Sequence, residues 1–295
     1  MQRTLFMHIP KTAGTSILWY MRQVYKDRPR LELRLQDGSI NSVSEDDVKS
    51  ADYIWLHEPI RLLKSGLTEH FRFTFLRDPL DRVRSLYSYL RDPEIIAKQD
   101  FSKVPTYYVE SLKRIQEMSF ADFVCSDDPV HANNVSNLYG IYLAGDAWPA
   151  GMPADEMLSH CCDRLRDVFH YVGLTSSLAE DMDVIQSICF PEVSTRFGNL
   201  TTNASRKEGA DIELGDKALG IVRERLGLDL EIYRRACQLR DERYRSFRLR
   251  TQQPGSAAGH APPAGAATAP EQAPSSASLT EVPSGQASRG FSDPR

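Results

Sequence analysis

The stretch from Leu5 to Met21 limits the fold of this chain more than any other. A short apolar run at residues 5–7 is long enough to end a buried strand, and residues 17–21 are apolar without a helix breaker, which predicts a helix. The turn between them contains Lys11 and Gly14. In a strand–loop–helix unit, backbone N–H groups and the positive end of the helix dipole point toward one place, and this arrangement is typical of an anion-binding site.

The side chains of the loop also suit an anion. Lys11 supplies a full positive charge, while Thr12, Thr15 and Ser16 supply hydroxyl donors. Gly14 lets the backbone approach a ligand because it has no Cβ. The loop differs from the phosphate loop of ATPases, in which Lys directly follows the second Gly, because here the Lys comes three residues before the Gly.

Strands and helices are expected to alternate along the chain. Besides residues 5–7, short β-prone runs predict strands at residues 31–35, 53–56, 71–76 and 171–174. Helices are expected at residues 17–27, 80–90, 119–124, 157–169, 178–190 and 214–248, with one or two more between 92 and 118. This alternation predicts an α/β fold, a three-layer, P-loop-like parallel sheet flanked by helices.

Polar clusters directly follow three of the predicted strands. They are the loop at residues 10–16, the pair His57-Glu58 and the pair Arg77-Asp78. In a parallel sheet of this kind, ligands bind at the carboxyl ends of the strands. We therefore expect the three clusters to share one edge of the sheet.

The segment around Arg77 predicts a second anion-binding element. Asp78 is a plausible N-cap of the helix that follows, with Pro79 at its first position. The guanidinium of Arg77 can hold a phosphate through two parallel hydrogen bonds, and Ser85 can donate a hydroxyl from two turns into the helix. Alternatively, Arg77 pairs with Asp78 or Asp81 and binds no ligand.

Two stretches carry a family resemblance. His8-Ile9-Pro10-Lys11-Thr12-Ala13-Gly14-Thr15-Ser16 resembles the 5′-phosphosulfate loop of the PAPS-dependent sulfotransferases, in particular the carbohydrate branch that includes the heparan sulfate and uronyl 2-O-sulfotransferases. Residues 75–90 resemble the 3′-phosphate motif of that family. These enzymes bind 3′-phosphoadenosine 5′-phosphosulfate (PAPS) and move its sulfuryl group to an acceptor hydroxyl, which leaves adenosine 3′,5′-bisphosphate. The resemblance covers roughly residues 4–210.

The resemblance implies a role for each motif. The 5′ end of PAPS would be held by Lys11, Thr12, Ala13, Gly14, Thr15 and Ser16, and the 3′-phosphate by Arg77 and Ser85. Lys11 would bridge to the leaving phosphate oxygen, where a positioned cation stabilises the charge that builds as the S–O bond breaks. No Asp, Glu and His cluster has metal-ligand spacing, and the family is not thought to need a metal for transfer.

Transfer to an alcohol needs a base, because an alcohol is a poor nucleophile until its proton is taken. His57 follows the second core strand, in the region where the 2-O-sulfotransferases place a catalytic His, and other carbohydrate sulfotransferases use a Glu where Glu58 stands. Neighbouring side chains at a strand end point opposite ways, so one of the two is expected to face the sulfate. We favour His57, because neutral imidazole is common near pH 7, and keep Glu58 as the alternative. His8 lies on the first strand and is expected to pack.

Two further stretches match the family loosely. Arg206 and Lys207 stand in a late polar loop, like an Arg-Lys loop that closes over the 3′-phosphate, although basic residues in such a loop can also be simply solvated. Residues 133–140 resemble an Asn-x-x-Thr-Arg stretch near the family's acceptor site, with Ser136 and Asn137 where Thr and Arg would stand. The missing Arg argues against an acidic glycan as the acceptor.

Composition limits the partners. The chain has 295 residues, of which 41% are hydrophobic, so it can bury a core. Its net charge of −4 argues against a nucleic-acid partner held by bulk charge, and the expected partner is a sugar-containing or other hydroxyl acceptor. Five cysteines, an odd number without metal-ligand spacing, favour free thiols in a reducing compartment.

The two ends of the chain suggest its organisation. No charged-then-apolar leader precedes the first strand and no apolar run is long enough for a membrane span. Animal members of the resembled family are anchored in the Golgi by an N-terminal helix, so the resemblance implies either a cytoplasmic, bacterial member or a trimmed chain. Residues 1–250 are expected to form the sulfotransferase domain. Residues 251–295 are dominated by Pro, Gly, Ala and Ser and are predicted to form a disordered tail, because they cannot bury enough surface to offset their ordering entropy.

Two other functions compete with sulfuryl transfer. An ATP- or GTP-dependent phosphotransferase of the phosphate-loop class would need Gly-Lys-Ser/Thr and a carboxylate placed to hold Mg²⁺, and the sequence shows neither. A non-catalytic nucleotide-binding module that regulates a partner would need no base and no leaving-group cation. Candidates for both are present, which favours an enzyme.

Overall fold

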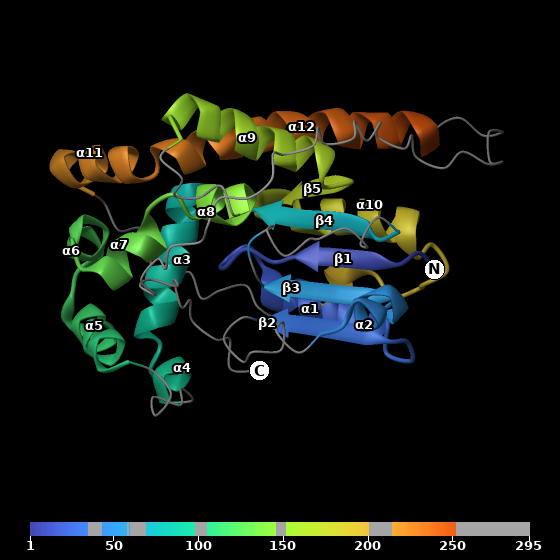
Figure 1. The fold of residues 1–295 in the computed structure, drawn as a ribbon, viewed down its shortest axis with the longest axis horizontal. Coiled ribbons are helices and arrows are strands. Elements are labelled where there is room, and N and C mark those ends of the chain that lie inside the picture. The colour runs from blue at the N-terminus through green and yellow to red at the C-terminus, as the bar shows by residue number, and fades with distance from the viewer. Residues whose placement is uncertain are drawn as a thin grey trace, which may run out of the picture.

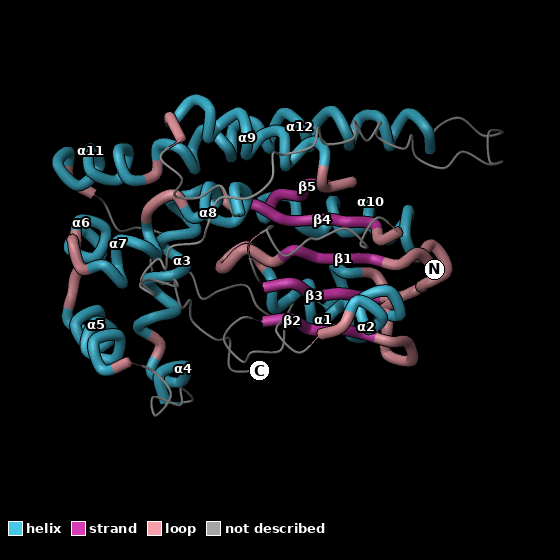
Figure 2. Tube along the Cα trace, in the orientation of Figure 1, coloured by secondary structure: helices cyan, strands magenta, loops and turns pink. Residues whose placement is uncertain are grey.

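A five-stranded sheet forms the centre of the computed structural model, which describes residues 1–34, 43–57, 59, 69–97, 105–145, 152–200 and 214–251. All neighbouring strands are parallel, in the order β2-β3-β1-β4-β5 (Figures 1 and 2). The strands are β1 (Thr4–Met7), β2 (Arg30–Arg34), β3 (Tyr53–His57), β4 (Phe71–Leu76) and β5 (Tyr171–Leu174). All five strands predicted from the sequence are confirmed, and so is the α/β fold.

Helices cover both faces of the sheet. One face packs against α1 (Gly14–Val24) and α10 (Leu178–Cys189), and the other against α8 (Leu138–Ala144), α9 (Ala154–Asp167) and α12 (Gly227–Thr251). A further group gathers beyond the carboxyl ends of the strands (Figure 1). Its members are α3 (Pro79–Arg91), α4 (Pro93–Ala97), α5 (Thr106–Glu117), α6 (Phe120–Cys125), α7 (Pro129–Val135) and α11 (Asp216–Arg225). The short helix α2 (Glu45–Ser50) precedes β3, and single 3₁₀ turns follow β5 (Thr175–Ser177) and α10 (Phe197–Leu200).

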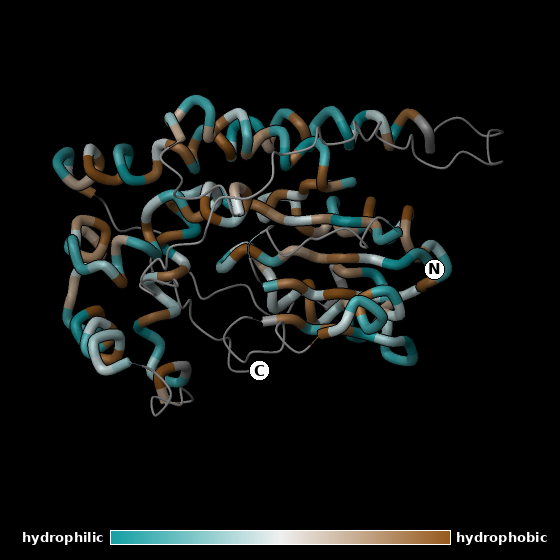
Figure 3. Tube along the Cα trace, in the orientation of Figure 1, coloured by the Kyte–Doolittle hydropathy of each residue, from teal (hydrophilic) through white to brown (hydrophobic). Residues whose placement is uncertain are grey.

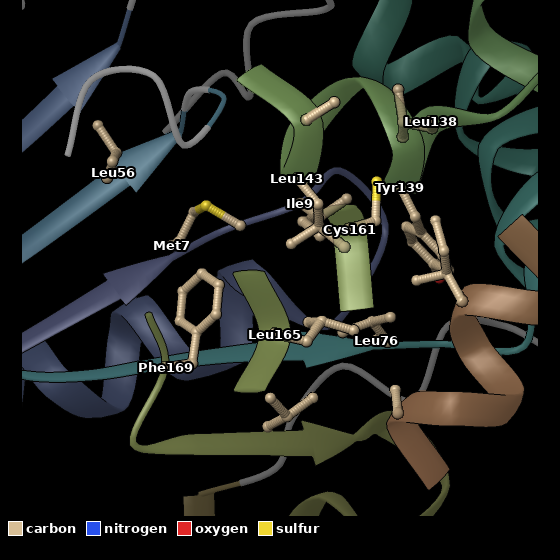
Figure 4. Packing of buried hydrophobic residues seen from close by; sticks show 14 of the residues in the cluster. Met7, Ile9, Leu56, Leu76, Leu138, Tyr139, Leu143, Cys161, Leu165 and Phe169 are labelled. Atoms are coloured by element: carbon tan, nitrogen blue, oxygen red, sulfur yellow. The ribbon is translucent and has the colours of Figure 1, made fainter. Parts of the chain in front are cut away.

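Strands β1, β3, β4 and β5 carry apolar side chains on both faces, as expected for a parallel sheet between two helical layers, whereas the edge strand β2 alternates leucines with charged residues. Leu5 and Met7 of β1 join the core beneath α8, α9 and α12, while Phe6 joins an aromatic core with Phe73 and the helices α1 and α10. Figure 3 shows these central strands largely in brown, and Figure 4 shows the first of the two cores from close by. Burying both faces fixes the register of these four strands, because a shift of one residue would exchange the two cores.

Several helix predictions need correction. The first helix begins at Gly14 rather than at residue 17, because the chain turns sharply at Ala13. The stretch 214–248 forms two helices, since α11 ends at Arg225 and α12 begins at Gly227. Three short helices, α2, α7 and α8, were not expected. The first two carry start signals that the sequence analysis passed over: a Ser44–Asp47 capping box and an Asp-Pro step before Val130.

The end of α12 at Thr251 lies close to the predicted domain boundary, and the predicted disordered tail lies outside the described residues except for Thr251. Among the helices that the structure describes, none combines the length and the apolar character that crossing a membrane requires.

Candidate active site

Three segments meet at the carboxyl edge of the sheet. β1 lies between β3 and β4 and runs parallel to both, with Met7 beside Leu56 on one side and Thr74 on the other. The loop after β1, the end of β3 and the first residues after β4 therefore lie side by side, as the sequence predicts. In Figure 1 the arrowheads of these strands point toward the side of the molecule where α3 lies.

The loop after β1 makes a sharp turn. Lys11 and Ala13 have φ angles of 69° and 66°, in the left-handed region. Non-glycine residues in this region cost about 1–3 kcal/mol each and are concentrated at binding sites. Thr12 is buried between them, and its hydroxyl donates to the carbonyl of Ile9 at 2.8 Å. This hydroxyl, predicted to contact a ligand, closes the turn in the structure.

The first turn of α1 has no side-chain cap. Ala13 is its N-cap residue and carries no polar group, while its carbonyl accepts the first helical hydrogen bond from Ile17 at 3.1 Å. Thr15 is exposed and Ser16 is half-buried in the same turn. The start of α1 therefore offers backbone N–H groups and two hydroxyls next to Lys11, which is the composition of an anion site.

Gly14 is required by packing within the protein. A Cβ on Gly14 would lie 1.9 Å from Nε2 of His8, far inside van der Waals contact. The glycine is predicted to allow the close approach of a ligand, and in the structure the space where its Cβ would lie is filled by the imidazole of His8. His8 is 6% exposed, which confirms that it packs. The imidazole therefore supports the start of α1 from below the loop.

Lys11 joins the loop to α3. Its ammonium nitrogen lies 3.8 Å from the centroid of the Tyr89 ring, a cation–π distance. Tyr89 stands on α3 one turn beyond Ser85, so these two side chains lie on the same side of the helix. The loop motif and the Arg77–Ser85 motif are thus in direct contact, although they are far apart in sequence.

Arg77 follows the last residue of β4 and is half-buried. Its two acidic neighbours have other partners: Asp78 caps α3 by accepting from the N–H groups of Leu80 and Asp81 at 3.0 and 3.1 Å, and the Asp81 carboxylate pairs with Arg84 at 3.1 Å. The N-cap and the proline at the first turn are confirmed. These contacts weaken the alternative in which Arg77 merely pairs with Asp78 or Asp81.

His57 is the last residue of β3 and lies in an aromatic stack. Its ring centroid is 4.7 Å from that of His8, with the planes 19° apart, and 5.2 Å from that of Trp55. His57 is 7% exposed. Because His8 lies beneath Gly14, the stack connects His57 to the start of α1 through one ring. A candidate base and the candidate anion loop therefore belong to one packed unit.

The remaining predicted residues divide into two groups. Glu58, Arg206 and Lys207 lie outside the described residues. Asn137, at the loosely matched acceptor stretch, is the N-cap residue of α8 and has a left-handed φ of 47°. In the described ranges, no group of three or more His, Cys, Asp or Glu is placed to hold a metal ion.

Sequence reasoning missed two contributions to the site. Tyr89 contacts Lys11 and Tyr139 contacts Arg77, each from a distant part of the chain. Tyr89 follows the Ser of its motif at helical spacing, which was a usable signal. Nothing near Tyr139 in the sequence points to Arg77.

Comparison with known proteins decides the family. A model of the sulfotransferase family matches residues 2–219, about three quarters of the chain. The chain belongs to the sulfotransferase family. Comparison with the curated proteins finds no match. The matched span of this sulfotransferase includes the loop after β1, His57 and the Arg77–Ser85 motif. It ends within α11, so α12 lies beyond it.

Membership supports sulfuryl transfer as the general activity and a transferase as the class of enzyme. Sulfotransferases generally use PAPS as the donor.

Proposed function

We propose that this sulfotransferase uses PAPS to sulfate a hydroxyl of a carbohydrate or glycan-containing acceptor. One observation carries the proposal: the ammonium of Lys11 lies 3.8 Å from the Tyr89 ring, on the helix that also bears Ser85. The loop that suits a phosphosulfate and the element that suits a second phosphate therefore occupy one edge of the sheet. A donor with a charged group at each end matches this pair of sites.

The residues present fit such a donor at its 5′ end. The first turn of α1 has no side-chain cap, so its N–H groups and dipole are suited to the 5′-phosphosulfate. Lys11 supplies a positive charge, which would also stabilise the leaving phosphate oxygen. Thr15 and Ser16 would add hydroxyl contacts, while Thr12 and Gly14 maintain the shape of the loop.

The residues at α3 fit the 3′-phosphate in a different way. Asp78 closes the start of α3 with a carboxylate, which disfavours an anion there, so the phosphate contacts are assigned to the side chains of Arg77 and Ser85. Arg206 and Lys207 are proposed as further contacts to the same phosphate, on the family resemblance. PAPS supplies the transferable sulfuryl group, and the chain supplies the positive charge at both ends.

His57 is proposed to take the proton of the acceptor hydroxyl. It stands at the end of β3, beside the segment that carries Lys11, and its ring is held against His8 and Trp55. A base that is fixed in orientation by stacking needs little reorganisation when the acceptor binds. Glu58 is the alternative base. The proposed acceptor is sugar-containing, and Asn137 in place of an Arg favours a neutral sugar over an acidic one.

Ligand-dependent thermal stability tests the donor. We expect adenosine 3′,5′-bisphosphate to raise the melting temperature and ATP with Mg²⁺ to leave it nearly unchanged, because a ligand stabilises the fold it binds. Stabilisation by ATP with Mg²⁺ alone would instead favour a phosphotransferase.

Sulfur-labelled PAPS and a panel of neutral and acidic oligosaccharides test transfer. His57→Ala is expected to lower turnover by about 10²–10⁴-fold, the usual contribution of a general base, while the affinity for the bisphosphate stays close to that of the wild type. If Glu58→Ala has this effect and His57→Ala does not, the base is Glu58.

A further inference from the structure

Tyr139 holds both peptide groups of Arg77. Its hydroxyl accepts a hydrogen bond from the Arg77 N–H at 2.9 Å and donates one to the Arg77 carbonyl at 2.5 Å. The side chain of Tyr139 is fully buried, so water does not compete for these bonds. A single hydroxyl that bonds to the N–H and the carbonyl of one residue restrains both backbone dihedrals of that residue.

Tyr139 is itself fixed from two sides. It stands in the first turn of α8, where Oδ1 of Asp229 accepts from the N–H groups of Tyr139 and Gly140 at 2.9 and 3.2 Å. Asp229 belongs to α12 and is fully buried. Charge-assisted bonds of this kind are the strong ones among protein hydrogen bonds. In Figure 4 Tyr139 reaches into the core from the start of α8, beside Leu138.

Arg82 is the second residue that holds Tyr139 in place, after Asp229. This guanidinium is fully buried on α3, donates to the carbonyls of Asn134 and Val135 at 3.1 Å, and lies 6.0 Å from the centroid of the Tyr139 ring. Arg82 thereby ties α3 to the end of α7, just before α8. The hydroxyl of Tyr139 thus connects the end of β4 to the place where α3, α7, α8 and α12 contact one another.

We infer that Tyr139 is a positioning residue that aims Arg77 at the 3′-phosphate of the nucleotide. This inference rests on the proposed function, in which Arg77 meets that phosphate. Arg77 is the first residue beyond β4, where the ladder no longer restrains it. Bidentate recognition of a phosphate requires the guanidinium fork to be held in a defined direction, and this direction starts from the backbone of Arg77.

A purely structural role for Tyr139 predicts a different outcome. Loss of packing at α8 would weaken every nucleotide alike, whereas misplacing Arg77 weakens only nucleotides that carry a 3′-phosphate. The ratio of affinities for adenosine 3′,5′-bisphosphate and adenosine 5′-phosphate therefore separates the two roles, because the ligands differ only in the group that Arg77 is proposed to hold.

Calorimetric titration of both nucleotides into the full chain tests the inference. Tyr139→Phe keeps the ring and is expected to lower the bisphosphate affinity by about tenfold, the effect of losing buried hydrogen bonds, and to change adenosine 5′-phosphate binding by less than about twofold. The matched control is Tyr25→Phe, because the buried Tyr25 hydroxyl likewise accepts a bond, from Thr4 at 3.2 Å, and donates one, to the Gln2 carbonyl at 2.6 Å, at the opposite end of β1. Tyr25→Phe should leave the ratio unchanged. An unchanged ratio in Tyr139→Phe, or an equal loss for both nucleotides, overturns the inference.

Arg77→Ala supplies the second arm. If Tyr139 acts through Arg77, the Arg77→Ala/Tyr139→Phe double variant loses no more bisphosphate affinity than Arg77→Ala alone, and additive losses contradict the inference. Should Tyr139→Phe fail to fold, Asp229→Asn takes its place, because an amide oxygen accepts more weakly than a carboxylate from the N–H groups of Tyr139 and Gly140. The same ratio should fall, and an unchanged ratio overturns the inference. A wild-type chain that binds neither nucleotide would contradict the proposed function instead.

Discussion

Helices α1 and α3 follow neighbouring strands of one sheet, yet they begin in opposite ways. The N-cap of α1 is Ala13, which has a left-handed backbone and no capping side chain. The N-cap of α3 is Asp78, whose carboxylate accepts from two backbone N–H groups, and a proline fills the next position. The start of α1 is therefore electropositive, and the start of α3 is neutralised from within the protein.

The difference shows how two anion sites on one sheet edge can use different chemistry. An uncapped helix forgoes about 1 kcal/mol of stability. A ligand that accepts hydrogen bonds from its first N–H groups restores stability when it binds. A capped helix gains that stability and must recognise an anion with side chains, here Arg77 before the helix and Ser85 within it. In the proposed function, the uncapped helix faces the end of the donor where charge changes during transfer.

The largest expected effect is the loss of Lys11. Lys11→Ala should reduce turnover by about 10²–10³-fold, because it removes the cation that balances the leaving oxygen. Steady-state assay with sulfur-labelled PAPS measures this effect. Lys26→Ala is the control, since Lys26 is an exposed lysine just beyond α1. Near-wild-type turnover in Lys11→Ala would contradict the proposal that the loop before α1 stabilises the leaving oxygen.

Gly14→Ala should destabilise the fold by about 1–3 kcal/mol, the usual cost of overpacking, because the new Cβ would lie 1.9 Å from His8 Nε2. Urea unfolding measures the change. Gly220→Ala, in the helix α11 with no atom within 4 Å of the added Cβ, should instead stabilise the chain by about 0.5–1 kcal/mol. Equal changes in the free energy of unfolding for the two substitutions would mean that a Cβ at position 14 does not clash with His8.

Ala13→Asp would make α1 resemble α3. Asp tolerates the left-handed conformation and can cap the first N–H groups, so the fold should be kept while the affinity for adenosine 3′,5′-bisphosphate falls by about tenfold or more. Ala13→Asn, which has the same shape without the charge, should lose much less. Titration calorimetry compares the two. Unchanged binding in Ala13→Asp would show that the start of α1 is not where the 5′ end is held.

Asp78→Ala makes the reverse change. It should cost about 1 kcal/mol of stability through the lost cap and leave bisphosphate affinity within about twofold. Ser119→Ala is the matched control, because the Ser119 hydroxyl caps α6 by accepting from the Asp122 N–H at 3.1 Å, away from the sheet edge. Thermal melts and titration give both numbers. A large drop in affinity for Asp78→Ala alone would mean that this carboxylate contacts the ligand.

The comparison also shows what the sequence can predict. The strands at 53–56 and 71–76 were recognisable because both faces of the sheet are buried, which leaves near-continuous apolar runs. The Asp78 cap was recognisable because a cap acts over three residues. The lack of a cap on α1 depends on the φ of Ala13, a residue for which that conformation is rare, and no local pattern announces it.

Long-range contacts set the limit of that prediction within the candidate site. The helix α8 starts in a polar stretch and is stabilised by Asp229, about 90 residues later in the chain. The hydroxyl of Tyr139 bonds to Arg77 across a gap of 62 residues, and the His8 ring occupies the space beside Gly14 only because β1 and α1 fold back on each other. Motifs identified the residue types of the site, but the partners that orient them come from elements that the sequence does not place.

Helix α8 begins in a third way, because the Asp229 carboxylate from α12 accepts hydrogen bonds from its first turn. The pH dependence of this contact is the smallest expected effect. Burial raises the pKa of this carboxyl to about 6, against the charge of Arg82 and the N–H groups of α8, which lower it. Because the folded pKa lies above the unfolded value of 3.8, this carboxyl contributes most stability below pH 4 and loses that contribution as the pH rises through 6. Asp229→Asn has no such titration, so the melting temperature of the wild type relative to Asp229→Asn should fall between pH 4 and pH 7. A constant difference over this range would mean that Asp229 ionises as easily as the exposed carboxyls do.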